Sequence, residues 1–156
     1  METRQANKTD IESIANIYRA CFPKELNHQL WIESSFNSFP RGVYYVISFE
    51  GQVCGYILWC VKNGFRENTI IELEQIGVHP DFSGKGIGRK LIERTLEEFK
   101  EHLSTLGHSV GAIVVTTSED NFAENLYKTT LGVVRAAVIT DYGSGNEVVL
   151  YNNRVN

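Results

Sequence analysis

A glycine-rich turn between a strand-like run and a helical run constrains this chain more than any other feature. The segment "GVHPDFSGKGIGRKLIERTL", residues 77–96, has glycine at positions 84, 86 and 88 and continues in a helical pattern. Because glycine costs backbone entropy, such a cluster usually marks backbone that approaches something closely. A strand, a glycine turn and a helix present free N–H groups and a positive helix end to an anion. With Lys85 and Arg89 nearby, the segment predicts a phosphate site. The alternative is a plain tight turn.

Two common phosphate-binding loops do not fit the spacing. A Walker loop requires G-x-x-x-x-G-K-[ST], but Gly86 follows Lys85 and no glycine stands five residues before Gly84. A dinucleotide-binding G-x-G-x-x-G fingerprint requires its third glycine one residue later than Gly88. These mismatches disfavour a nucleotide-binding regulatory domain.

Composition limits the remaining classes of function. The chain has 156 residues and a net charge of −4, so we expect a single domain over residues 1–156 that does not bind nucleic acid. The polar start "METRQANKTD" is no signal peptide, and no apolar run approaches the roughly 20 residues of a membrane span. Cys21, Cys54 and Cys60 lack metal-type spacing and are interpreted as reduced core residues of a cytoplasmic protein.

The periodicity predicts the order β–α–α–β–β–β–α–β–α–β–β, an α/β domain with a mixed sheet. A capping box of Thr9 and Glu12 is predicted to open the first helix. The run "VGAIVVTT" lacks alternation and predicts a strand covered on both faces. No range is assigned to the first strand of this order. The other expected elements are a helix from Thr9 to Phe22, a helix over 28–36, hairpin strands over 42–50 and 52–61, a strand over 70–78, a helix over 86–103, a strand over 110–117, a short helix over 118–130 and a hairpin over 133–153.

The glycine turn resembles the signature [QR]-x-x-G-x-[GA] of the GNAT superfamily of N-acetyltransferases. Ser83-Gly84-Lys85-Gly86-Ile87-Gly88 matches it except at the first position, where serine replaces glutamine or arginine. "IGVHPDFSGKGIGRKLI" and "AENLYKTTLGV" are also similar to family segments, and the element order agrees. The resemblance implies a mixed, mostly antiparallel sheet with a central β-α-β crossover and helices on both faces.

The resemblance further implies a bound coenzyme A thioester, acetyl-CoA. Its diphosphate would lie on the backbone amides of the turn, and its pantetheine arm would pair with the strand edge near Ile76 and Val78. The resemblance also implies a cofactor contact by an asparagine near the last predicted helix. Asn121 is the expected residue, with Asp120 as the alternative. The implied cofactor-binding residues are Ile76, Gly77, Val78, Ser83, Gly84, Lys85, Gly86, Ile87, Gly88, Arg89 and Asn121.

Three residues are candidates for acid–base chemistry. Glu72 and Glu74 stand two apart in an apolar strand and share one face. The resemblance places a general base, often acting through water, at Glu72, and Glu74 is a substitute that could contact the substrate. The alternative for both carboxylates is a structural ion pair or exposure to solvent. Tyr127 falls where the family carries the tyrosine that protonates the thiolate; the alternative is a core tyrosine.

The resemblance implies an acetyl-CoA-dependent N-acetyltransferase that acts on a primary amine by direct attack in a ternary complex. A non-catalytic acyl-CoA-binding sensor is the alternative. Phe22, Trp31 and Tyr142 lie where this fold shapes the acceptor pocket, although they are equally compatible with core or rim positions. The four histidines make no metal constellation. The acceptor stays open between a polyamine, an amino acid, an aminoglycoside and a protein terminus, and the sequence does not decide whether the protein is a homodimer.

Overall fold

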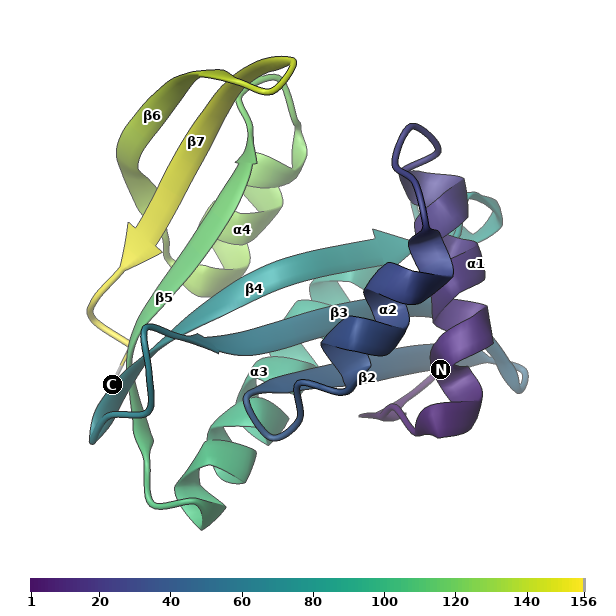
Figure 1. Cartoon of the computed structure of the whole chain (residues 1–156), viewed down its shortest axis with the longest axis horizontal. Helices are drawn as coiled ribbons and strands as arrows, with labels where there is room; N and C mark the ends of the chain where they lie inside the picture. Colours follow the sequence, from purple (N-terminus) through teal and green to yellow (C-terminus); the bar gives the residue numbers. More distant parts are fainter. Residues whose placement is uncertain (156) are drawn as a thin grey trace. The chain divides into compact units, whose positions relative to one another are not determined.

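The structure, a computed structural model, describes residues 1–155 (Figure 1). Within these residues, seven strands and four α-helices follow one another in the predicted order, with two short 3-10 helices (η1, η2) in addition. The elements are β1 Glu2–Gln5, η1 Lys8–Asp10, α1 Ile11–Cys21, α2 His28–Phe36, β2 Gly42–Phe49, β3 Gln52–Lys62, β4 Asn68–Val78, η2 Pro80–Phe82, α3 Ile87–Thr105, β5 Ser109–Ser118, α4 Ala123–Leu131, β6 Val134–Tyr142 and β7 Gly145–Asn152.

One sheet contains all seven strands in the order β1-β2-β3-β4-β5-β7-β6. The pairs β1–β2, β2–β3, β5–β7 and β6–β7 are antiparallel, whereas β4 and β5 are parallel. Helix α3 connects the two parallel strands, which makes the expected β-α-β crossover. The predicted fold, a mixed and mostly antiparallel sheet with one central crossover, is confirmed.

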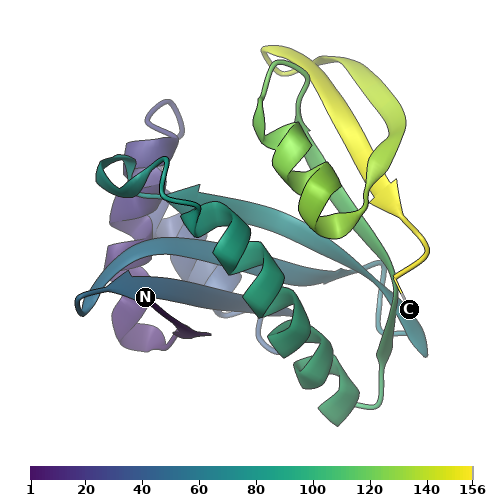
Figure 2. The ribbon, with the colours of Figure 1, turned by 180° about the vertical axis from the view of Figure 1, so that it is seen from behind.

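The chain forms two compact units: Met1–Cys60 with Gln75–Phe99, and Val61–Glu74 with the residues from Lys100 onward. In the first unit, α1 and α2 cover one face of the sheet and α3 the other (Figures 1 and 2). The indole of Trp59 stacks on Phe99 with ring centroids 6.2 Å apart and donates a hydrogen bond to Thr95 at 2.9 Å. These contacts fix α3 on β3. The expectation of a single domain stays a prediction.

The second unit contains β5, β7, β6 and α4. The side-chain amide of Asn152 donates to the carbonyl of Leu131 at 2.8 Å and holds the end of α4. The predicted double coverage of β5 is wrong at its carboxyl end, where Thr116 and Ser118 are exposed while Val115 and Thr117 are buried. This alternation is that of a strand buried on one face. Helix α4 also begins later than expected, at Ala123.

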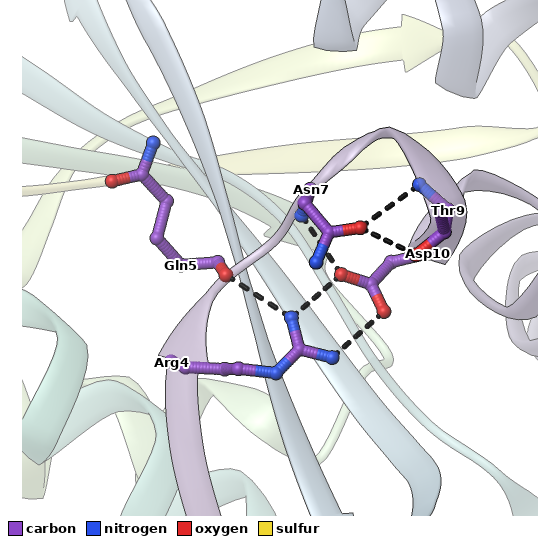
Figure 3. A network of polar contacts seen from close by, with 5 residues as sticks. All are labelled: Arg4, Gln5, Asn7, Thr9 and Asp10. Atoms are coloured by element: carbon purple, nitrogen blue, oxygen red, sulfur yellow. Dashed lines mark hydrogen bonds and ion pairs between the residues drawn. The ribbon is translucent and has the colours of Figure 1, made fainter.

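The N-terminal cap differs from the prediction (Figure 3). The side chain of Asn7 accepts a hydrogen bond from the backbone N–H of Thr9 at 2.9 Å, and the Asp10 carboxylate accepts from the backbone N–H of Asn7 at 2.8 Å. The capping box is therefore Asn7 with Asp10, two residues before the predicted pair of Thr9 and Glu12. Arg4 donates two hydrogen bonds to Asp10, at 2.7 and 2.9 Å, and its guanidinium lowers the pKa of that carboxyl.

Two further expectations concern the whole chain. Within residues 1–155, no helix is both long enough and apolar enough to cross a membrane. The three thiols are free, but only Cys54 and Cys60 are buried; Cys21 is half-buried and is thus not a full core residue. A cytoplasmic location stays a prediction.

Candidate active site

The glycine turn connects η2 to α3 in the first unit. Gly84 and Gly86 have φ angles of +75° and +72°, in the left-handed region that favours glycine. A Cβ atom at either position would meet no protein atom within 4 Å. Backbone conformation, rather than protein packing, therefore explains these two glycines, and the space beside them is open to a ligand.

The first turn of α3 supplies donors at this loop. The N–H of Lys90 donates to the carbonyl of Gly86 at 3.1 Å, which is the first helical hydrogen bond. The N–H groups of Ile87 and Gly88 precede it and have no acceptor within the helix. Open glycines beside free helical N–H groups fit the diphosphate that the sequence predicts here.

The segment before the loop is a fixed turn. The Nδ1 atom of His79 accepts a hydrogen bond from the N–H of Asp81 at 3.2 Å, so this histidine caps η2. The hydroxyl of Ser83 donates to the carbonyl of Pro80 at 2.8 Å. At the other end of the loop, Arg89 pairs with Glu93 at 3.2 Å.

The end of β4 is shaped by close packing. A Cβ atom on Gly77 would lie 2.6 Å from the Tyr56 ring, so only glycine fits there. The Tyr56 hydroxyl donates to Gln75 at 2.9 Å, and the Cys21 thiol donates to the carbonyl of Val78 at 3.2 Å. The parallel ladder ends at the pair Glu72↔Val114, and residues 73–78 of β4 continue beyond it.

Glu72 belongs to the second unit and has a partner. Its carboxylate lies 2.9 Å from the ammonium of Lys62 on β3, and its side chain is 13% exposed. This contact is the structural ion pair that the sequence left open as the alternative to catalysis. Glu74, two residues along the same strand, is exposed.

Tyr127 lies on α4 and is 6% exposed. Burial raises the pKa of its phenol to about 12. Within its own unit, none of the described residues accepts a hydrogen bond from this hydroxyl. A buried neutral phenol is consistent with a proton donor and equally with the core tyrosine of the alternative.

Sequence reasoning missed an ionic cluster on the same helix. Arg135 of β6 binds the Glu124 carboxylate through Nε and Nη2 at 2.7 and 2.8 Å, and Lys128 lies 2.9 Å from it. Hydrogen bonds from Arg135 and Lys128 lower the pKa of Glu124 to about 2. The spacing of Glu124 and Lys128 was readable as a helical ion pair. The contact of Arg135 with Glu124 was not readable, because Arg135 lies on β6, outside the helix, 11 residues after Glu124.

Asn121 lies two residues before the start of this helix. Its side-chain oxygen accepts a hydrogen bond from the N–H of Ala123 at 2.9 Å. The residue also lines a cavity of about 430 Å³ in the second unit. The cavity is lined by Asn121, Phe122, Glu124, Asn125, Lys128 and Arg135. Asp120, the alternative to Asn121, is exposed.

The predicted acceptor residues differ in exposure. Phe22 is half-buried and packs on Tyr18 with ring centroids 5.5 Å apart, so it contributes to the core. Trp31 is 42% exposed and Tyr142 58% exposed. No group of three or more acidic, histidine or cysteine side chains among residues 1–155 could hold a metal ion.

The predicted residues are divided between the two units. The first unit contains the predicted cofactor-binding residues of β4 and the glycine turn, which form one continuous segment, and it also contains Phe22 and Trp31. The second unit contains Glu72, Glu74, Asn121, Tyr127 and Tyr142.

Residues 11–133 match the Acetyltransferase (GNAT) family, and the chain belongs to this family. The match includes β4, the glycine turn, α3 and α4, which are the elements that carry the predicted site.

Two curated relatives match part of the chain. N-acetylaspartate synthetase of Xenopus tropicalis is 28% identical over 108 residues, which are 69% of this chain and 36% of that protein. The L-amino acid N-acyltransferase MnaT of Escherichia coli K12 is 31% identical over 121 residues, covering 65% of this chain and 64% of that protein. The chain thus spans less than two thirds of the length of both relatives.

The fold is that of solved acetyltransferases. An aminoglycoside 6'-N-acetyltransferase crystallised with coenzyme A superposes with a TM-score of 0.78 over 97% of this chain and 96% of that one. Its sequence is 12% identical, so this likeness concerns the fold alone.

Proposed function

We propose that this chain is an acetyl-CoA-dependent N-acetyltransferase that moves an acetyl group to a primary amine by direct attack in a ternary complex. Membership of the GNAT family and a relative named as an L-amino acid N-acyltransferase support the proposal. The observation that carries it is the glycine turn, where two left-handed glycines open the backbone beside the free N–H groups of α3.

The first unit would bind the acetyl donor. Backbone amides of residues 84–89 would receive the diphosphate, and Lys85 would contribute positive charge. The backbone of β4 near Ile76 and Val78, beyond the last pair with β5, would hydrogen-bond the pantetheine arm as an added strand does. The thiol of Cys21 already contacts the carbonyl of Val78, so the other groups of this segment would make those bonds.

Glu72 and Tyr127 are the candidates for the proton transfers. Acetyl-CoA provides the thioester carbonyl; the amine nitrogen forms the new C–N bond and the C–S bond breaks. Glu72 would accept the proton that the amine loses, through a water molecule, and Tyr127 would donate its phenolic proton to the departing sulfur. Because Lys62 already binds Glu72, Glu74 stays the substitute candidate for the base or for a substrate contact.

The binding proposal can be tested at Gly86. In Gly86→Val, a β-branched side chain must adopt a positive φ and occupies the open side of the loop. We expect calorimetry to show at least a tenfold loss of coenzyme A affinity. Gly107→Val is the matched control, because Gly107 has φ +87° and equally open surroundings at the end of α3.

The two variants together separate ligand binding from backbone strain. Both should lose comparable thermal stability, yet only Gly86→Val should lose affinity. Unchanged affinity in a folded Gly86→Val protein would remove the site from the glycine turn. Equal losses of affinity in both variants would attribute the effect to strain.

The ion pair between Glu72 and Lys62 favours a second candidate, a non-catalytic acyl-CoA-binding sensor. Release of free thiol from acetyl-CoA, measured across a panel of polyamines, amino acids, aminoglycosides and peptides, decides between the two. An enzyme shows amine-dependent release, whereas a sensor binds the thioester and releases none.

A further inference from the structure

The ring of Phe82 connects the β2–β3 hairpin to the glycine turn. Phe82 is the last residue of η2 and is half-buried. Its ring contacts Phe49 at the end of β2, with centroids 6.2 Å apart and planes at 62°, and His79, with centroids 6.3 Å apart and planes at 78°. The ring of Phe82 thus contacts both the end of β2 and the residue before η2.

The ammonium group of Lys85 lies over the ring of Phe82. The ammonium nitrogen lies 5.3 Å from the centroid of Phe82, which is within cation–π range. Among residues 1–155, no carboxylate forms an ion pair with Lys85. The other cation of the loop, Arg89, is bound to Glu93 at 3.2 Å. Unlike Arg89, Lys85 therefore keeps a positive charge that no ion pair with a carboxylate of the described residues neutralises.

Ser83, which begins the glycine turn, has a short side chain. Ser83 occupies the position where the resembled motif has glutamine or arginine. Its hydroxyl donates to the carbonyl of Pro80 at 2.8 Å and is thus directed back into η2. A long polar side chain is missing at this position, and Lys85, two residues later, stands between the two left-handed glycines.

We propose that Lys85 makes the phosphate contact that Ser83 cannot make, and that Phe82 is its positioning residue. The inference rests on the proposed function, because the phosphate is the diphosphate of acetyl-CoA. The ring restricts the conformations of the lysine side chain before binding. Less conformational entropy is then lost when the ammonium meets the phosphate.

A double-mutant cycle on the full chain tests this coupling. Coenzyme A affinity is measured by calorimetry for the parent, Lys85→Met, Phe82→Leu and the double variant. Lys85→Met should raise Kd about tenfold, as expected for a charge-assisted phosphate contact. Phe82→Leu keeps an apolar side chain but removes the ring, and should raise Kd about 2- to 5-fold. The double variant should bind as Lys85→Met does.

Two controls keep the result specific. Lys8→Met removes one positive charge from η1, the other 3-10 helix of the first unit, and should leave Kd unchanged. Phe82→Trp preserves an aromatic face and should retain the parent affinity. If Phe82→Leu is poorly folded, this tryptophan variant paired with Lys85→Met still measures the lysine contact at an intact ring.

The outcomes separate this inference from the proposed function. No coenzyme A binding by the parent protein would overturn both. Normal binding by the parent with an unchanged Kd in Lys85→Met would overturn the lysine contact alone. Equal effects of Phe82→Leu with and without Lys85 would show that the ring supports the loop without positioning the lysine, which overturns the coupling.

Discussion

Replacing Tyr127 by phenylalanine separates proton donation from packing. The residue is 6% exposed, so its ring is part of the packed interior, and the substitution keeps that ring. Within its unit the hydroxyl has no hydrogen-bond acceptor among the described residues, so its loss should change the free energy of unfolding by less than about 1 kcal/mol. We therefore expect an unfolding temperature close to that of the parent.

The effect on turnover should be much larger. If Tyr127 gives its proton to the departing thiolate, Tyr127→Phe should lower kcat about 10- to 10⁴-fold, the range for a general acid that water replaces partly or hardly at all. Affinity for acetyl-CoA should change little, because a thioester sulfur accepts hydrogen bonds poorly. The assay is steady-state thiol release with the best amine, together with thermal unfolding and calorimetry.

The raised pKa of Tyr127 leads to a second, independent prediction, on the pH dependence of kcat. A proton donor acts below its pKa, and with a pKa of about 12 only about one phenol in 1,000 is ionised at pH 9. Deprotonation of Tyr127 should therefore cause no fall in kcat between pH 7 and pH 10. An alkaline loss of rate near pH 9 that disappears in Tyr127→Phe would contradict the burial argument. Parent-like turnover of Tyr127→Phe would make the residue a core tyrosine.

The carboxylates of Glu72 and Glu124 give two further testable outcomes. Glu72→Gln should lower the rate most near neutral pH, with partial recovery at higher pH where free amine is abundant; a uniform loss across pH would assign Glu72 to structure, through its ion pair with Lys62. Glu124 has a pKa lowered to about 2 from an ordinary 4.5, so its stabilisation is present above about pH 4.5 and is lost as the pH falls toward 2. The difference in unfolding temperature between the parent and Glu124→Gln should accordingly be full at pH 7 and shrink below pH 4.5, whereas exposed Glu12→Gln should show little difference at either pH. A difference that stays constant from pH 7 to pH 3 would refute the assignment to Arg135 and Lys128.

Local patterns were sufficient for the order of the helices and strands and for the glycine turn. The hairpin of residues 42–50 and 52–61 was readable because Gly51, which takes a φ of +81°, separates two strand-like runs. The turn at residues 83–88 was readable for the same reason, since Gly84 and Gly86 adopt a conformation that glycine favours over other residues. Both signals depend on the backbone of a few neighbouring residues, which the sequence specifies directly.

The first cap shows where local reasoning stops. Thr9 with Glu12 and Asn7 with Asp10 are both acceptable capping boxes by spacing. Arg4 decides between them, because its guanidinium binds the Asp10 carboxylate through two hydrogen bonds. Strand β1 brings Arg4 to that position by pairing with β2, a contact between residues more than 40 positions apart.

The same limit applies to the candidate chemistry. The sequence placed Glu72 and Glu74 on one face of a strand and Tyr127 on a helix. It did not show that Lys62 pairs with Glu72, that Arg135 binds Glu124, or that Tyr127 is buried with its pKa raised to about 12. Charge partners and burial come from strands and helices that meet only when the chain has folded, and these surroundings decide the protonation chemistry of a carboxylate or a phenol.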